Sequence, residues 1–105
     1  MRIEILTFEG CPNADVTREL VLRAVRSAAV DAAIEYINVE TPELSQRLRF
    51  LGSPSVRVDG DDVELSANGR TSYGLMCRSY AYGPEVAGAP PIAMIRAAIL
   101  RHAAV

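Results

Sequence analysis

The first thirty residues contain two different periods of hydrophobic positions. Residues 2–8 are apolar on both faces, as in a strand buried at the centre of a sheet. From residue 13 to about residue 30 the apolar positions instead recur every three or four residues, with arginine and glutamate between them. This pattern predicts an amphipathic helix. Pro12 suits its first turn, where a missing N–H does no harm.

A second strand and a second helix are predicted next along the chain. Residues 33–39 carry closely spaced apolar and β-branched side chains, which favours a strand. Thr41 can cap a helix that starts at Pro42 and continues to residue 51. Because a helix joins the first two strands, they should lie parallel with a right-handed crossover.

The second half of the chain begins with two short predicted strands. Residues 55–58 and 63–65 flank Asp59-Gly60-Asp61, which is a strong hairpin signal. Residues 66–90 contain many glycines and prolines without a sustained period, so we expect a long loop there. A last helix opens at Pro91.

These elements predict an α/β fold in the order βαβαββα. We expect a four-stranded mixed sheet with helices on both faces, in one domain that spans residues 1–105. The chain has 105 residues, half of them apolar, which is enough for a core without disulfides or metals.

Composition narrows the classes of partner. The net charge of −2 argues against nucleic acid or an anionic membrane as the main partner. No apolar run approaches the length of a spanning helix, and residues 1–20 lack the pattern of a signal peptide. We therefore expect a cytoplasmic protein, in which two cysteines are more often reactive or inert thiols than a permanent disulfide.

Cys11 is the first candidate for chemistry. It stands where the first strand passes into the first helix, so helix N–H groups and the helix dipole favour its thiolate. The alternative is a small buried apolar residue. Pro54, just before the strand at residues 55–58, suits a fixed turn with a cis peptide bond.

Three segments resemble known proteins. Glu9-Gly10-Cys11-Pro12-Asn13 and Gly52-Ser53-Pro54 resemble the thioredoxin superfamily. Gly74-Leu75-Met76-Cys77-Arg78-Ser79-Tyr80 resembles small bacterial thioredoxin-like proteins that are sometimes labelled alkylmercury lyase-like. The resemblance implies a thioredoxin-like fold.

The resemblance also implies site roles. Cys11 would be the nucleophile, and Pro12, Ser53 and cis-Pro54 would bind substrate. The backbone of Ser53 would be ready to pair with a bound extended chain. Ala14 stands where the family has its second cysteine, so a disulfide cycle confined to the helix start is not possible.

Cys77 is the only other cysteine of the chain. The predicted strand order returns the chain to the Cys11 edge of the sheet at Leu65, so the loop that carries Cys77 should emerge there. Cys77 is therefore a candidate second catalytic thiol, and a packed loop thiol is the alternative. Asp15 is expected to complement the helix N-terminus rather than to accept the proton of Cys11.

Three further side chains have structural interpretations. Tyr73, Tyr80 and Tyr82 are expected to pack the loop rather than to line a pocket. His102 is expected at the end of the last helix, away from Cys11.

Two functions from different classes follow. The first is a thiol–disulfide oxidoreductase that acts through Cys11, with Cys77 as the resolving thiol and a protein or low-molecular-weight thiol or disulfide as partner. The second is a non-catalytic protein that binds a small ligand, a peptide or a soft metal through Cys11 and Cys77. No cofactor is expected, and no spacing of repeated metal ligands appears. The spacing of Cys11, Asp15 and Cys77 does not match organomercurial lyase, so lyase activity is not expected.

Overall fold

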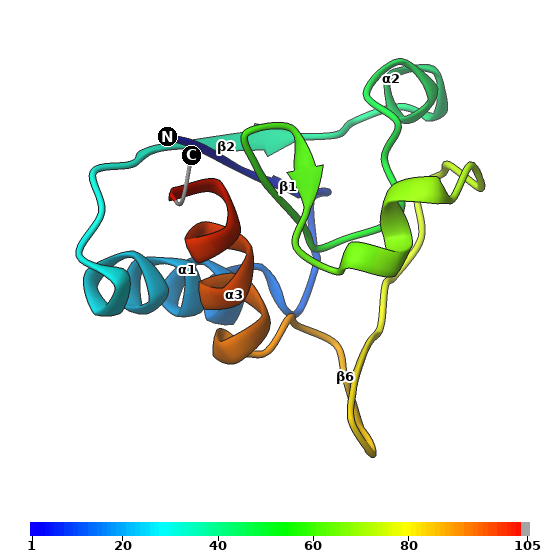
Figure 1. The fold of residues 1–105 in the computed structure, drawn as a ribbon. Coiled ribbons are helices and arrows are strands. Elements are labelled where there is room, and N and C mark those ends of the chain that lie inside the picture. Colours follow the sequence, from blue (N-terminus) through cyan, green and yellow to red (C-terminus); the bar gives the residue numbers. More distant parts are fainter. Residues whose placement is uncertain (104–105) are drawn as a thin grey trace.

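A four-stranded mixed sheet in the order β2-β1-β3-β4 forms the centre of the protein, seen in a computed structural model that describes residues 1–103 (Figure 1). The strands are β1 (Arg2–Thr7), β2 (Ala33–Asn38), β3 (Ser55–Val58) and β4 (Asp61–Asp62). β1 lies parallel to β2 and antiparallel to β3, with Ile5 opposite both Tyr36 and Val56. The predicted α/β class with a four-stranded mixed sheet is therefore confirmed.

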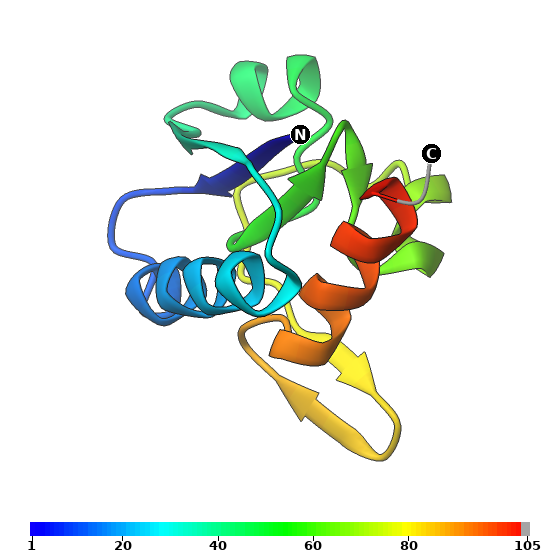
Figure 2. The same cartoon turned by 60° about the vertical axis from the view of Figure 1, so that its left-hand side comes forward.

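Helices cover both faces of this sheet (Figures 1 and 2). α1 (Ala14–Ala28) and α3 (Ile92–Ala103) pack together on one face, and α2 (Pro42–Arg47) lies on the other. Successive side chains of β1 point to the two faces of the sheet alternately. Ile5 packs in the core beneath α1 and α3, whereas Leu6 packs in a smaller core beneath α2. Full burial of such a side chain stabilises the fold by about 1.5–3 kcal/mol.

α2 begins where the sequence predicts and ends earlier. Thr41 is its N-cap, and the side-chain oxygen of Thr41 accepts a hydrogen bond from the backbone N–H of Leu44 at 3.1 Å. The helix ends at Arg47 rather than at residue 51. Arg49 has a φ of +54°, which reverses the chain and brings Phe50 back into the core beneath α2.

The segment after β3 departs from the prediction of a strand at residues 63–65. The paired strand contains only Asp61 and Asp62, and the N–H of Val63 adds one last backbone hydrogen bond to the carbonyl of Val56 at 3.1 Å. The chain then turns, because the Asp62 side chain accepts the backbone N–H of Glu64 at 2.8 Å. It continues as a short 3-10 helix, η1 (Leu65–Gly69).

The predicted loop at residues 66–90 also contains regular structure beyond η1. β5 (Tyr80–Tyr82) and β6 (Glu85–Ala87) form a separate two-stranded hairpin that projects from the body of the protein (Figure 2). Gly83, with a φ of +61°, lies in its turn. Within residues 1–103, no helix is both long and apolar enough to cross a membrane.

Candidate functional site

Cys11 lies at the carboxyl end of β1, in two consecutive turns that lead into α1. Its backbone N–H donates to the carbonyl of Phe8 at 3.3 Å, and its own carbonyl accepts the N–H of Ala14 at 3.3 Å. Its side chain is half-buried. Asn13 is the N-cap of α1, so Pro12 precedes the helix instead of occupying its first turn. Cys11 therefore lies next to the positive end of α1 but outside the helix.

The turn before β3 is attached to the same part of β1. The peptide bond between Ser53 and Pro54 is cis, and both residues are buried. The side-chain oxygen of Ser53 accepts the backbone N–H of Phe8 at 3.3 Å. Phe8 thus holds Cys11 through its carbonyl and Ser53 through its N–H, which places the two predicted site segments side by side.

A strap of four residues, Leu75–Arg78, crosses the Ser53 turn. The N–H of Ser53 donates to the carbonyl of Met76 at 2.8 Å, and the carbonyl of Ser53 accepts the N–H of Arg78 at 3.0 Å. Ser53 and Cys77 are therefore partners in an isolated parallel bridge. The expectation that the Ser53 backbone is ready for a bound extended chain is wrong, because the strap already occupies both groups.

Gly52 makes this close crossing possible. A side chain at this position would begin 3.0 Å from the carbonyl oxygen of Met76 and 3.1 Å from the Cβ of Arg78. Gly52 also has a φ of +113°, which residues with side chains rarely adopt. The strap and the turn therefore fit together only through a bare backbone at residue 52.

Arg78 fastens the strap to the sheet through a buried group of side chains, the anchor cluster. The cluster consists of Ser55, Asp62, Glu64, Arg78 and Tyr80. Nη1 of Arg78 donates to Oδ2 of Asp62 at 2.7 Å, and Nη2 donates to Oδ1 at 2.8 Å. Nη1 also reaches Oγ of Ser55 at 3.0 Å, and Nη2 reaches Oε1 of Glu64 at 3.3 Å. This forked geometry is the strong arrangement of arginine with carboxylate.

Burial and charge act in opposite directions on Arg78. Burial favours a lower pKa for the guanidinium, but hydrogen bonds and charge from Asp62 and Glu64 outweigh it and raise the pKa. The Arg78 side chain is only 3% exposed and remains a cation. A buried cation held by two carboxylates fixes the position of the strap, because moving it would leave Asp62 without a cation and Glu64 with only the half-exposed Arg70, 3.2 Å away.

Tyr80 attaches the strap a second time. Its hydroxyl donates to the carbonyl of Pro54, and the guanidinium of Arg78 lies 4.3 Å from the centre of its ring. The ring is fully buried, and burial raises the pKa of the phenol. The expectation that Tyr80 packs the loop down is therefore confirmed, whereas Tyr82 is 47% exposed on the hairpin.

The segments that carry the two thiols are joined through Ser53, which bonds to Phe8 and to the residues beside Cys77. Neither takes part in a disulfide, and Cys77 is exposed. Side chains alternate along an extended segment, so Cys77 faces away from the anchor cluster into which Arg78 points. Its backbone lies one strand spacing from Ser53, about 4.8 Å for paired strands, and Ser53 in turn contacts Phe8.

An open hollow of about 290 Å³ lies on the other side of Cys11. It is lined by Thr7, Phe8, Glu9, Gly10, Cys11, Ala14, Arg18, Tyr36, Ile37 and Asn38. Arg18 lies over the ring of Tyr36, 5.1 Å from its centre, and Nη1 donates to Asp15 at 3.2 Å. Asp15 lies in the first turn of α1, where it complements the positive helix end, and its side chain is 97% exposed.

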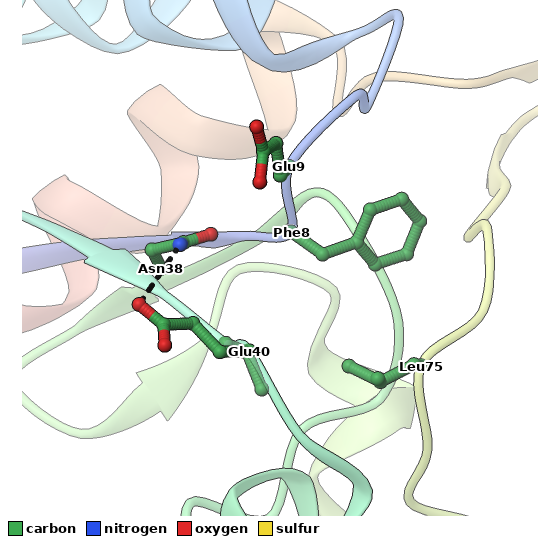
Figure 3. Close-up of a pocket in the computed structure, with 6 residues that line it drawn as sticks. Phe8, Glu9, Asn38, Glu40 and Leu75 are labelled. Carbon is green, nitrogen blue, oxygen red and sulfur yellow. Dashed lines mark hydrogen bonds between the residues drawn. The ribbon is translucent and has the colours of Figure 1, made fainter.

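A larger hollow of about 560 Å³ adjoins the first and reaches the strap (Figure 3). In this view the Phe8 ring and Leu75 of the strap lie on one side of the hollow, and the carboxylates of Glu9 and Glu40 lie on the other. Asn38 donates to Glu40 at 3.4 Å. Phe8, Glu9 and Asn38 line both hollows, and the two adjoining hollows are together called the depression beside Cys11.

The other predicted residues lie away from this depression. His102 lies at the far end of the sheet from Cys11, as expected. Its ring nitrogens are 3.8 Å from Asp59 and 3.2 Å from Asp61. Tyr73 is half-buried near η1. In the part of the chain that the structure describes, no group of three or more His, Cys, Asp or Glu side chains is placed to hold a metal ion.

Four important side chains were not predicted: Arg18, Asp62, Glu64 and Arg78. The sequence carries a weak signal for the last three, because Asp62 and Glu64 alternate around Val63 and Arg78 is next to Cys77. Nothing local pairs them, since Arg78 is sixteen residues from Asp62 and fourteen from Glu64.

Comparisons with known proteins do not assign the chain to a family. No family model matches the chain, and neither a curated protein nor a solved structure matches it.

Proposed function

We propose that this chain is a thioredoxin-like thiol–disulfide oxidoreductase that acts through Cys11, with Cys77 as the second thiol. One observation carries the proposal. Ser53 bonds both to Phe8, which holds the backbone of Cys11, and to the two residues that flank Cys77. A single buried residue therefore links the segments of the only two cysteines in the chain.

The fold supports the same function. A central β1 with a parallel neighbour on one side and an antiparallel neighbour on the other, covered by helices on both faces, is the arrangement expected of a minimal thioredoxin-like domain. Cys11 follows β1, and the cis Ser53–Pro54 bond precedes β3. A cytoplasmic location, where thiols are kept reduced, suits this role.

We propose a cycle of two thiol–disulfide exchange steps. The Cys11 thiolate attacks one sulfur of a substrate disulfide, forms a mixed disulfide and releases the other half as a thiolate, which takes a proton from solvent. The Cys77 thiolate then attacks the Cys11 sulfur and releases the second half. The substrate gains two electrons, and the protein is left with a Cys11–Cys77 disulfide that an external thiol reduces.

Trapping the mixed disulfide tests this function. Reduced protein is treated with bis(2-hydroxyethyl) disulfide, a neutral probe, and is followed by intact mass spectrometry and peptide mapping. The wild type should end with a Cys11–Cys77 disulfide, and Cys77→Ser should stop at the adduct on Cys11. A first adduct on Cys77, or an unreactive Cys11, would contradict the proposal.

A non-catalytic binding protein is the second candidate, favoured by the depression of two adjoining hollows beside Cys11. In that case a small ligand would be held there without turnover. The same experiment separates the two functions, because binding alone predicts no thiol exchange at Cys11.

A further inference from the structure

The two sides of Cys11 are not equally accessible. On the β3 side, the strap uses the N–H and the carbonyl of Ser53. An extended polypeptide could pair there only by displacing Met76 and Arg78, which would pull a cation out of the anchor cluster. This side is therefore closed to a substrate that binds as an added strand.

The β2 side is open. The hollow that Cys11 lines there has a volume of about 290 Å³, at the lower end of the range for small-molecule sites. It lies between the start of α1 and the ends of β1 and β2, and no strap crosses it. A molecule of this size can reach Cys11 without any movement of the backbone.

Arg18 supplies the cation of the hollow. Its side chain is 43% exposed, and its position is held by the ring of Tyr36 and by the ion pair with Asp15. Three acidic groups lie nearby: Glu9 lines the hollow, Asp15 pairs with Arg18, and Glu40 lines the adjoining hollow. The Asp15 side chain is 97% exposed, and exposed ion pairs are weak. A carboxylate of a bound molecule can therefore bind Arg18 beside Asp15 or in its place. Arginine is well suited to this contact.

We propose that the substrate of Cys11 is a low-molecular-weight disulfide that carries a carboxylate, which enters the open hollow and is oriented by Arg18. This inference rests on the proposed function and names its substrate class. The bond changes are those of the cycle above: the Cys11 sulfur bonds to one half of the small disulfide, and the other half leaves as a thiolate.

The experiment compares three small disulfides of different charge. Cys77→Ser protein isolates the first step and is mixed with 3,3′-dithiodipropionate (a dianion), bis(2-hydroxyethyl) disulfide (neutral) or cystamine (a dication). The rate of Cys11 adduct formation is measured by mass spectrometry. The dianion should react faster than the dication, and the difference should shrink in high salt.

A substitution at Arg18 identifies the group that discriminates. Added to the Cys77→Ser background, Arg18→Gln should slow the dianion about fivefold, the effect of one unit charge a few ångströms away in a water-like medium, and leave the neutral probe unchanged. Arg23→Gln is the matched control, because Arg23 is exposed on the same helix and should alter neither rate.

The outcomes separate the two proposals. Equal losses for all three probes in Arg18→Gln, or no loss, would overturn the substrate class while the oxidoreductase function stands. Faster reaction with the disulfides of insulin than with the dianion would also overturn it in favour of a protein substrate. Absence of a Cys11 adduct with every probe would overturn the function itself.

Discussion

The two sides of Cys11 contain the same three types of residue in opposite surroundings. On the closed side, Arg78 pairs with Asp62 and lies over the Tyr80 ring. On the open side, Arg18 pairs with Asp15 and lies over the Tyr36 ring. The Arg78 and Asp62 side chains are 3% and 5% exposed, whereas those of Arg18 and Asp15 are 43% and 97% exposed.

Burial therefore decides what each trio does. A buried ion pair is costly to break, because the carboxylate that remains has no water to solvate it. An exposed ion pair exchanges its partners with water at little cost. The closed trio is suited to hold the strap in place, and the open trio leaves a cation available to a molecule in the hollow.

The largest expected effect is the removal of the buried cation. Arg78→Met should lower the free energy of unfolding by about 3–5 kcal/mol, because Asp62 stays buried without a cation and Glu64 keeps only Arg70. Arg18→Met is the matched substitution on the open side and should cost less than about 1 kcal/mol. Urea denaturation followed by circular dichroism measures both. Similar losses in the two variants would contradict the comparison.

The second effect concerns the crossing of the strap over Gly52. Gly52→Ala should cost about 1–3 kcal/mol more than Gly60→Ala, because overpacking is destabilising. Both glycines have positive φ, but a side chain at Gly60 would meet nothing within 4 Å. The difference between the two variants in urea denaturation therefore isolates the contact with the strap. Equal losses would mean that the strap lies elsewhere in solution.

The third effect is a loss of stability in alkali. Since burial raises the pKa of Tyr80, the fold favours the neutral phenol, and this contribution is present below the ordinary tyrosine value of about 10. Above that pH it should be lost by up to about 1.4 kcal/mol per pH unit. Tyr80→Phe should make the pH profile of the unfolding free energy flatter, whereas Tyr36→Phe, on an exposed ring, should leave it unchanged. A wild-type profile that matches Tyr80→Phe would refute this assignment.

The smallest effect is expected at the acidic residue of the open side. Asp15→Asn should change the free energy of unfolding by no more than about 0.5–1 kcal/mol, because it removes only an exposed ion pair and a helix-end charge. Asp62→Asn, which weakens the buried fork to Arg78, should cost several times more. Thermal unfolding of the two variants under the same buffer checks the ratio, and a ratio near one would remove the distinction between the trios.

The sequence predicts the parts of this fold that have a period or a local signal. Hydrophobic spacing places β1, β2, α1 and α3, and the cap at Thr41 places the start of α2. The strand predicted at residues 63–65 is wrong because the ladder with β3 ends at the hydrogen bond from Val63 to Val56. The Asp62 side chain then accepts the N–H of Glu64 and turns the chain, and Leu65 is 65% exposed.

The parts of the candidate site that have a short sequence motif could also be predicted, and the parts formed by distant residues could not. Cys11 and the Ser53–Pro54 turn are visible in short motifs. The strap is not, because its contacts join Ser53 to residues 23 to 25 positions away in a segment without a period. Arg78 resembles a surface arginine until its partners from β4 and the turn after it are brought together in space.

The strap also has a consequence for competition between segments. A strand that belongs to the same chain is present at its binding position at an effective concentration in the millimolar range for a short flexible connection. A free peptide at micromolar concentration with the same intrinsic affinity for Ser53 would therefore occupy it in only about one molecule in a thousand. The protein carries its own competitor for the backbone of Ser53, and extended segments of other proteins in a crowded cell would seldom be captured there.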